Sequence, residues 1–175
     1  MMFTAQLGKH GAFSIRYPRG KGMMTKWRTE FEELTVGKSR ELSEGDDLAI
    51  LSIGHIGNFA ADAVKELAKE NIQSTHIDMR FVKPIDEAQL HKIFKKHKYI
   101  ITVEDGTVVG GFGSAVLEFM ASNGYLSHVK ILGVPDKFVD HGTQQELWRE
   151  CGIDTTGIVS AAKKILKPNI FSKAM

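Results

Sequence analysis

The sequence is poor in cysteine, in long apolar runs and in excess charge of either sign. Cys151 is the only cysteine among 175 residues, so we expect no internal disulfide and a reducing, cytoplasmic location. No stretch reaches the roughly 18 consecutive apolar residues of a membrane span, so we expect no membrane partner. A formal charge of +2 provides no basic surplus for nucleic acid. The composition is that of a globular protein.

The residue patterns of a complete catalytic site are also absent. The seven histidines include no H-x-x-x-H pair with a nearby carboxylate, which argues against a zinc site. The turn Gly110–Ser114 has Val116 where a dinucleotide fingerprint needs its third glycine, and it lacks the lysine of a Walker loop. No nucleophile–base pair is evident. We therefore predict that the chain has no catalytic and no metal-binding residue. We also predict that it is one part of an enzyme and not a whole enzyme.

Strand and helix patterns alternate through most of the chain. The expected strands cover 36–42, 47–53, 74–79, 99–103 and 129–134, and the expected helices 59–69, 87–98, 114–122, 144–151 and 155–166. Alternation favours right-handed crossovers and a mostly parallel sheet of about five strands. A hairpin at Gly45–Asp46 would make the first strand an antiparallel edge strand. The predicted fold is a three-layer α/β/α sandwich.

The beginning of the chain does not fit this alternation. Residues 1–20 hold a short helical piece and an alternating strand over 12–17, which together cannot form a core. We interpret them as the tail of a preceding domain. Residues 21–35 are polar and without clear periodicity, and we interpret them as a linker to the main domain, 36–168, which a tail over 169–175 follows.

An acidic pair and a glycine-rich turn follow the central strand. Glu104 and Asp105 end that strand, and Gly110, Gly111 and Gly113 come before the next helix. Because glycine lets the backbone approach a neighbour closely, we expect Glu104 and the three glycines to contact another chain or domain. Two alternatives remain open: a carboxylate pair for acid–base chemistry or a hard cation, and phosphate binding at the turn.

Two further candidates lie outside this stretch. Arg16 and Arg19 bracket Tyr17–Pro18, and an arginine followed by glycine offers a fork of donors suited to a phosphate or carboxylate. His141 precedes a helix for which Thr143 is the expected cap, and it is the last interface candidate.

Four segments resemble one known family. They are SIRYPRGKG (14–22), DMRFVKPID (78–86), VEDGTVVGGFGSAV (103–116) and GVPDKFVDHGTQQEL (133–147). In order and spacing they are similar to 1-deoxy-D-xylulose-5-phosphate synthases, a group of transketolase-like enzymes. The β-subunit of a 2-oxo acid dehydrogenase would share the glycine turn but not the Y-P-R-G or H-G-T-Q segments.

The resemblance implies a fold like the transketolase C-terminal domain, preceded by the tail of a pyrimidine-binding domain. It implies that the full enzyme joins pyruvate to glyceraldehyde 3-phosphate with loss of CO2, using thiamine diphosphate and Mg²⁺, for isoprenoid, thiamine and pyridoxal biosynthesis. Arg19 would hold the phosphate of the aldehyde. The fragment would bind no cofactor, be inactive alone, and pack in a homodimer against the remaining domains. A stand-alone module that binds an anion or nucleotide is the alternative from another class.

Overall fold

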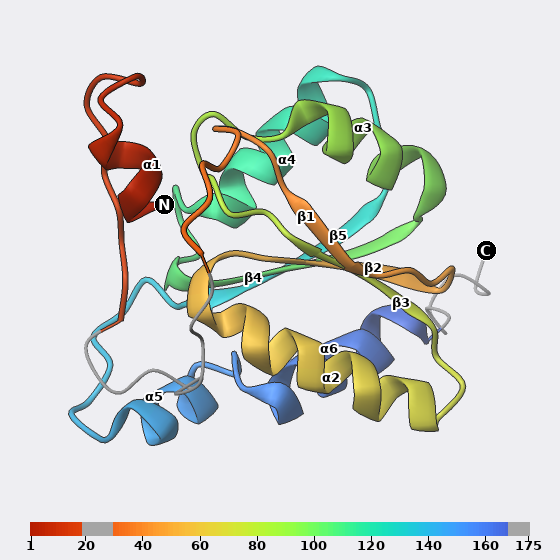
Figure 1. Cartoon of the computed structure of the whole chain (residues 1–175). Helices are drawn as coiled ribbons and strands as arrows, with labels where there is room; N and C mark the ends of the chain where they lie inside the picture. The colour runs from red at the N-terminus through yellow and green to blue at the C-terminus, as the bar shows by residue number, and fades with distance from the viewer. Residues whose placement is uncertain (19–29, 168–175) are drawn as a thin grey trace.

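The computed structural model describes residues 1–18 and 30–167, and its centre is a five-stranded sheet with the order β1-β3-β2-β4-β5 (Figure 1). The strands are β1 (Arg40–Ser43), β2 (Leu48–Ser52), β3 (Ser74–Asp78), β4 (Tyr99–Thr107) and β5 (His128–Val134). All neighbouring strands are parallel except β1, which is antiparallel to β3 at one edge. The predicted sheet is thereby confirmed.

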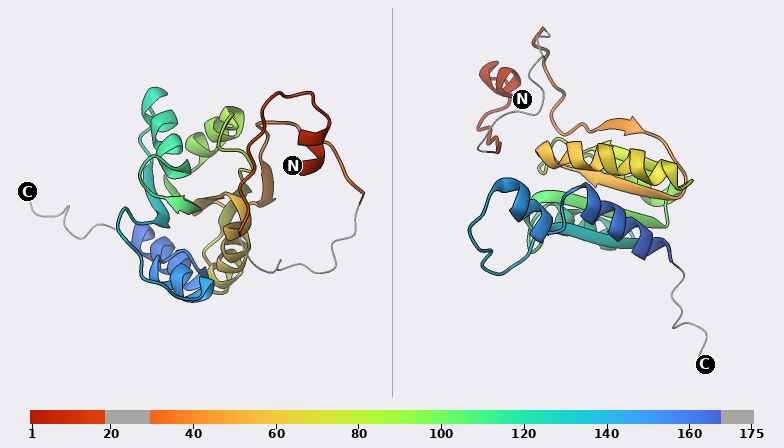
Figure 2. Two further views of the ribbon diagram at one scale, coloured as in Figure 1. Left: turned by 90° about the vertical axis from the view of Figure 1, so that its left-hand side faces the viewer. Right: turned by 90° about the horizontal axis from the view of Figure 1, so that it is seen from below.

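Helices cover both faces of this sheet (Figures 1 and 2). These are α2 (Gly57–Lys69), α3 (Glu87–Lys96), α4 (Phe112–Ser122) and α6 (Thr155–Leu166). The other described helices are α1 (Met2–Gln6), η1 (Gly54–Ile56) and α5 (Gln144–Glu150). One core packs α2 and α6 against the sheet, and a second core packs α3 and α4 against its other face. The three-layer sandwich is therefore confirmed.

Strand β2 shows why the sequence folds in this way. All five of its residues are buried, as expected for a strand covered on both faces. Leu48 and Ile50 point to the α2–α6 core, while Ala49 and Leu51 point to the α3–α4 core. Truncating one such buried leucine to alanine typically costs 2–5 kcal/mol of stability. The apolar run Leu48–Leu51 thus fixes the middle layer.

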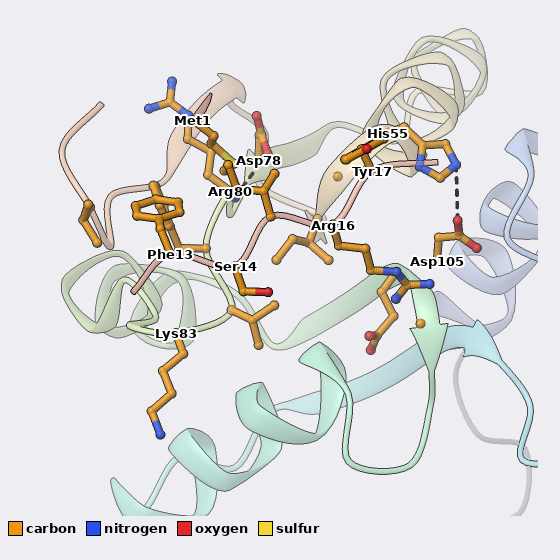
Figure 3. Close-up of a pocket in the computed structure, with 18 of the residues that line it drawn as sticks. Met1, Phe13, Ser14, Arg16, Tyr17, His55, Asp78, Arg80, Lys83 and Asp105 are labelled. Carbon is orange, nitrogen blue, oxygen red and sulfur yellow. Dashed lines mark hydrogen bonds and ion pairs between the residues drawn. The ribbon is translucent and has the colours of Figure 1, made fainter. Parts of the chain in front are cut away.

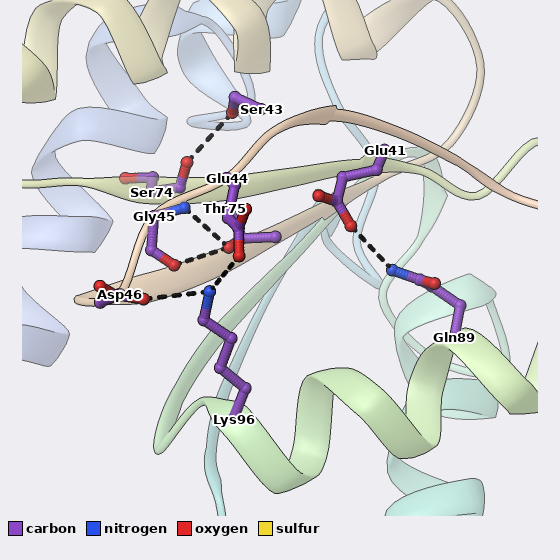
Figure 4. A network of polar contacts seen from close by, with 9 residues as sticks. All are labelled: Glu41, Ser43, Glu44, Gly45, Asp46, Ser74, Thr75, Gln89 and Lys96. Atoms are coloured by element: carbon purple, nitrogen blue, oxygen red, sulfur yellow. Dashed lines mark hydrogen bonds and ion pairs between the residues drawn. The ribbon is translucent and has the colours of Figure 1, made fainter.

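The predicted hairpin at Gly45–Asp46 is wrong, because β1 pairs with β3 and not with β2. The corner between β1 and β2 instead rests on β3 (Figure 4). Gly45 N donates to Thr75 Oγ1 at 3.1 Å, and Thr75 Oγ1 donates to Gly45 O at 2.8 Å. Lys96 adds ion pairs to Glu44 and Asp46 at 2.8 and 3.0 Å. These contacts lead the chain around the end of β3 and leave β1 on its far edge.

Other elements also differ from the prediction. The first strand begins at Arg40 and not at 36, because residues 36–37 lie in a turn. The predicted strand over residues 12–17 is wrong, because residue 12 lies in a bend and residues 13–17 have no regular secondary structure. Strand β4 continues past Val103 to Thr107, with a register shift against β5 between these two residues. At this irregularity the adjacent side chains of Glu104 and Asp105 reach different neighbours, the start of α4 and His55.

The N-terminal piece lies beside the sandwich rather than in its layers (Figure 2). Thr4 accepts a hydrogen bond from Leu34 N at 2.9 Å, and Lys9 pairs with Glu33 at 2.6 Å. Contact with the sandwich includes the Phe13 ring, whose centroid is 6.3 Å from that of Phe81. The segment that follows α1 is thereby placed against the loops at the carboxyl ends of the strands.

Candidate functional site

A pocket of about 670 Å³ lies at the carboxyl ends of β2, β3 and β4 (Figure 3). In open α/β sheets this is the edge where ligands are usually bound. Its walls come from the loop after β2 (53–55), the loop after β3 (78, 80–84), the end of β4 (104–106) and, opposite them, residues 12–18. The N-terminal segment therefore completes a pocket that the sandwich alone would leave open.

The three carboxylates in the pocket wall are already engaged. Asp78 Oδ2 accepts from Arg40 Nη2 at 2.9 Å. Asp105 Oδ2 lies 3.5 Å from His55 Nε2. Glu104 is turned toward the start of α4. None of the three is left to neutralise a cation inside the pocket.

Three cationic side chains line the same pocket without such a partner. They are Arg16, Arg80 and Lys83, and within the described residues none of them has an ion pair within 4.0 Å. Arg80 also has a φ of 58°, in the left-handed region where a non-glycine residue is strained. Engaged acids beside cations without ion pairs favour an anionic over a cationic small molecule in this pocket.

The glycine turn is different, because a carboxylate of the chain itself occupies its anion site. Glu104 is 5% exposed. Its Oε2 accepts from Phe112 N and its Oε1 from Gly113 N, both at 2.9 Å. A helix N-terminus attracts anions through its free N–H groups and its dipole, and here Glu104 satisfies both. The geometry thus disfavours a phosphate at this turn.

Close packing inside the chain explains two of the three turn glycines. A Cβ on Gly111 would lie 2.5 Å from Glu104 Oε2, and one on Gly113 would lie 2.6 Å from Ile131 Cγ2. Gly110 has a φ of +70° and open space around it. Glu104, Gly111 and Gly113 therefore pack against this chain's own elements, and their role toward another chain stays a prediction.

The remaining sequence candidates are separated from one another. His141 is exposed, in the loop before α5. The predicted cap of α5 is confirmed, since Thr143 and Glu146 form a capping box. Arg19 lies outside the described residues, while Pro18, directly before it in the chain, lines the pocket.

Sequence reasoning missed His55 and Arg80. His55 is wedged between Asp105 and the Trp148 ring, whose centroid is 5.1 Å away. Burial is the main cause that lowers the pKa of His55; Asp105 raises it and Arg16 lowers it. The only sequence signal was position, since both residues lie in the loops that follow strands β2 and β3.

Residues 1–18 and 30–167 contain neither a metal-binding cluster nor a membrane-spanning helix. No group of three or more histidine, cysteine or acidic side chains is arranged to hold a metal ion there. None of the helices in those ranges has the length and apolar character needed to cross a bilayer.

Comparison with known proteins places this chain in a family. Residues 37–158 match the transketolase C-terminal domain, and the chain belongs to that family. It is 58% identical over 166 residues to the 1-deoxy-D-xylulose-5-phosphate synthase of Cytophaga hutchinsonii, and 51% identical over 164 residues to that of Parabacteroides distasonis. Each match covers 94% of this chain but 26% of the relative. The chain thus spans about a quarter of the length of these relatives.

Solved structures agree on the fold. A structure described as "Split gene transketolase, inactive beta4 tetramer" has a TM-score of 0.72 and 33% identity, over 77% of this chain and 44% of that one. The transketolase of Campylobacter jejuni has a TM-score of 0.55 and 13% identity, over 73% of this chain and 18% of that one, and supports the fold alone.

Proposed function

We propose that the chain is the C-terminal part of a thiamine-diphosphate-dependent 1-deoxy-D-xylulose-5-phosphate synthase. The full enzyme would join the two-carbon unit left after decarboxylation of pyruvate to glyceraldehyde 3-phosphate and release CO2. Its product would supply isoprenoid, thiamine and pyridoxal biosynthesis in the cytoplasm. The observation that carries the proposal is the 58% identity to such a synthase along 94% of the chain.

The chain would contribute to binding the aldehyde phosphate rather than to chemistry. We assign Arg19 to this phosphate, and we assign no catalytic residue to the chain. Support comes from the pocket, where the cations Arg16, Arg80 and Lys83 have no ion pairs within 4.0 Å in the described part and Pro18 forms part of the wall. A guanidinium fork matches the geometry of phosphate oxygens.

Thiamine diphosphate and Mg²⁺ would be held by the remaining domains of the enzyme. The described residues do not fit them, because Glu104 fills the one helix N-terminus that follows a glycine-rich turn. The pocket carboxylates are engaged as well, with Asp78 bound to Arg40 and Asp105 facing His55.

The tail of the pyrimidine-binding domain would comprise residues 1–20, and a linker would follow over 21–35. The C-terminal domain would span 36–168, and a tail would follow over 169–175. The domain would pack in a homodimer and against the remaining domains, through Gly110 and its neighbours and through His141. Alone it would be inactive. The related structure described as an inactive β4 tetramer of a split-gene transketolase supports self-association without activity.

A chimera tests the proposal. The matching quarter of the Cytophaga hutchinsonii synthase is replaced by this chain, and formation of 1-deoxy-D-xylulose 5-phosphate is measured beside the parent enzyme and beside the chain alone. We expect the chimera to be active and the chain alone to be inactive. A folded, cofactor-loaded chimera without activity would contradict the proposed function.

A further inference from the structure

Side chains from three separate segments meet at one end of the pocket. Arg16 comes from the N-terminal segment, His55 from the loop after β2 and Asp105 from β4 (Figure 3). The His55 side chain is 19% exposed, with Nε2 3.5 Å from Asp105 Oδ2 and its ring beside Trp148. Its second ring nitrogen faces away from Asp105, on the side of Tyr17, and the Arg16 guanidinium lies nearer to Asp105 (Figure 3). Nε2 thus lies at ion-pair distance from Asp105 without a hydrogen bond among the described residues, and the other ring nitrogen is left for a ligand.

The charges at this end do not balance among the described residues. The Arg16 guanidinium has no ion pair within 4.0 Å there. Its Nη1 lies close to Gly106, 3.2 Å from the position that a Cβ on that glycine would take. Glu104 is bound to the start of α4 and Asp105 faces His55. The unpaired guanidinium offers one positive charge, and the imidazole beside it offers a further hydrogen-bond donor, which together suit an oxyanion.

We propose that Arg16 and His55 form a binding subsite for a doubly charged oxyanion, with Asp105 orienting the imidazole, and that anion binding is coupled to protonation of His55. The ligand class is a sulfate-like or phosphate-like group of a small molecule. This subsite is separate from the role assigned to Arg19. It rests on the pocket and not on the proposed reaction.

The coupling follows from what surrounds the imidazole. Burial and Arg16 lower the pKa of His55, and Asp105 opposes them. Glu104 on β4 and Tyr17 on the N-terminal segment lie at the same end, while α5 presents the uncharged Trp148. The remaining ionisable side chains of the pocket wall are His10, Asp78, Arg80 and Lys83. A bound dianion offsets Arg16 and attracts a proton, so the pKa of His55 rises on binding. By linkage, anion affinity must increase as pH falls.

Calorimetric titration of the 175-residue chain with sulfate, at constant ionic strength and from about pH 5.5 to 8, tests the subsite. Sulfate keeps its charge over this range, so any pH dependence belongs to the protein. We expect affinity to rise by up to about tenfold per unit fall in pH, the limit for one linked proton. His55→Gln should remove this dependence, and Arg16→Gln should weaken binding about tenfold at every pH.

His10 is the matched control, because it is the other histidine in the pocket wall. His10→Gln should keep the pH dependence. Absence of saturable sulfate binding, binding that does not change with pH, or loss of the dependence in His10→Gln rather than His55→Gln would each overturn the subsite. Since sulfate binding needs no other domain, an inactive chimera that still binds sulfate would refute only the proposed function.

Discussion

The glycine turn and the pocket lie at the same edge of the sheet, yet the anion-binding groups are occupied at the turn and free of ion pairs in the described part of the pocket. At the turn, Glu104 satisfies the N–H groups of Phe112 and Gly113 from inside the chain. In the pocket, Arg16 and Arg80 have no ion pair within 4.0 Å in the described part of the chain. Position at the carboxyl ends of strands therefore does not by itself define a binding site, and the local balance of charge does.

Removing the internal carboxylate should have the largest effect on this contrast. Glu104→Ala leaves two buried N–H groups at the start of α4 without an acceptor, and we expect a loss of about 4 kcal/mol in the free energy of unfolding. Urea denaturation measures it. Asp105→Asn is the matched control on the next residue and should change stability by less than about 0.5 kcal/mol. Equal losses in the two variants would refute the contrast.

The fold itself should respond to acid, and this response must be separated from that of the pocket. Burial is the main cause that lowers the pKa of His76 from 6.5 to about 4, and its Nε2 lies 2.8 Å from Ser52 Oγ. Between pH 6.5 and pH 4, His76 binds a proton in the unfolded chain but not in the folded chain, so stability falls as pH falls. We expect a loss of about 3 kcal/mol from pH 6.5 to 4.

Denaturation at several pH values measures this loss. His97, whose pKa is also lowered by burial, contributes to the same slope, so the difference between the protein and His76→Gln isolates the His76 share. His141→Gln, at an exposed position, should leave the slope unchanged. A slope that His76→Gln does not reduce would show that His76 is protonated in the fold.

A methyl group at the turn should test its packing. Gly113→Ala would bring Cβ within 2.6 Å of Ile131 Cγ2 and 2.7 Å of Thr102 Oγ1, and overpacking of this kind costs about 2 kcal/mol. Thermal unfolding checks it. Gly142→Ala, whose Cβ would be 3.3 Å from the flexible end of Leu147, should be nearly neutral. If Gly113→Ala left the stability unchanged, β5 would be able to shift away from α4 at little cost.

The smallest expected effect is that of replacing Arg19, the residue predicted to bind the phosphate. Arg19→Ala in the active chimera should raise the KM for glyceraldehyde 3-phosphate about tenfold, equivalent to about 1.4 kcal/mol, with little change in the KM for pyruvate. Arg19→Lys should recover part of the loss by retaining the charge. Unchanged KM and kcat for the aldehyde would remove Arg19 from the phosphate site.

The sequence predicted those features that depend on local pattern. The buried run in β2 and the strand–helix alternation led to the five-stranded sandwich, and Thr143 was correctly expected to cap α5. The neighbour of β1 was not predictable from the Gly45–Asp46 turn, because Thr75 on a distant strand holds that corner. Likewise, the pocket depends on residues 12–18 meeting three loops, which no local pattern encodes.

The contact between His55 and Trp148 gives the molecule an optical signal. A protonated imidazole quenches indole fluorescence on contact, and the two ring centroids are 5.1 Å apart. The sequence has two tryptophans, so a Trp27→Phe variant would emit from Trp148 alone. Its emission would then follow the protonation of His55 directly, without any added dye or label.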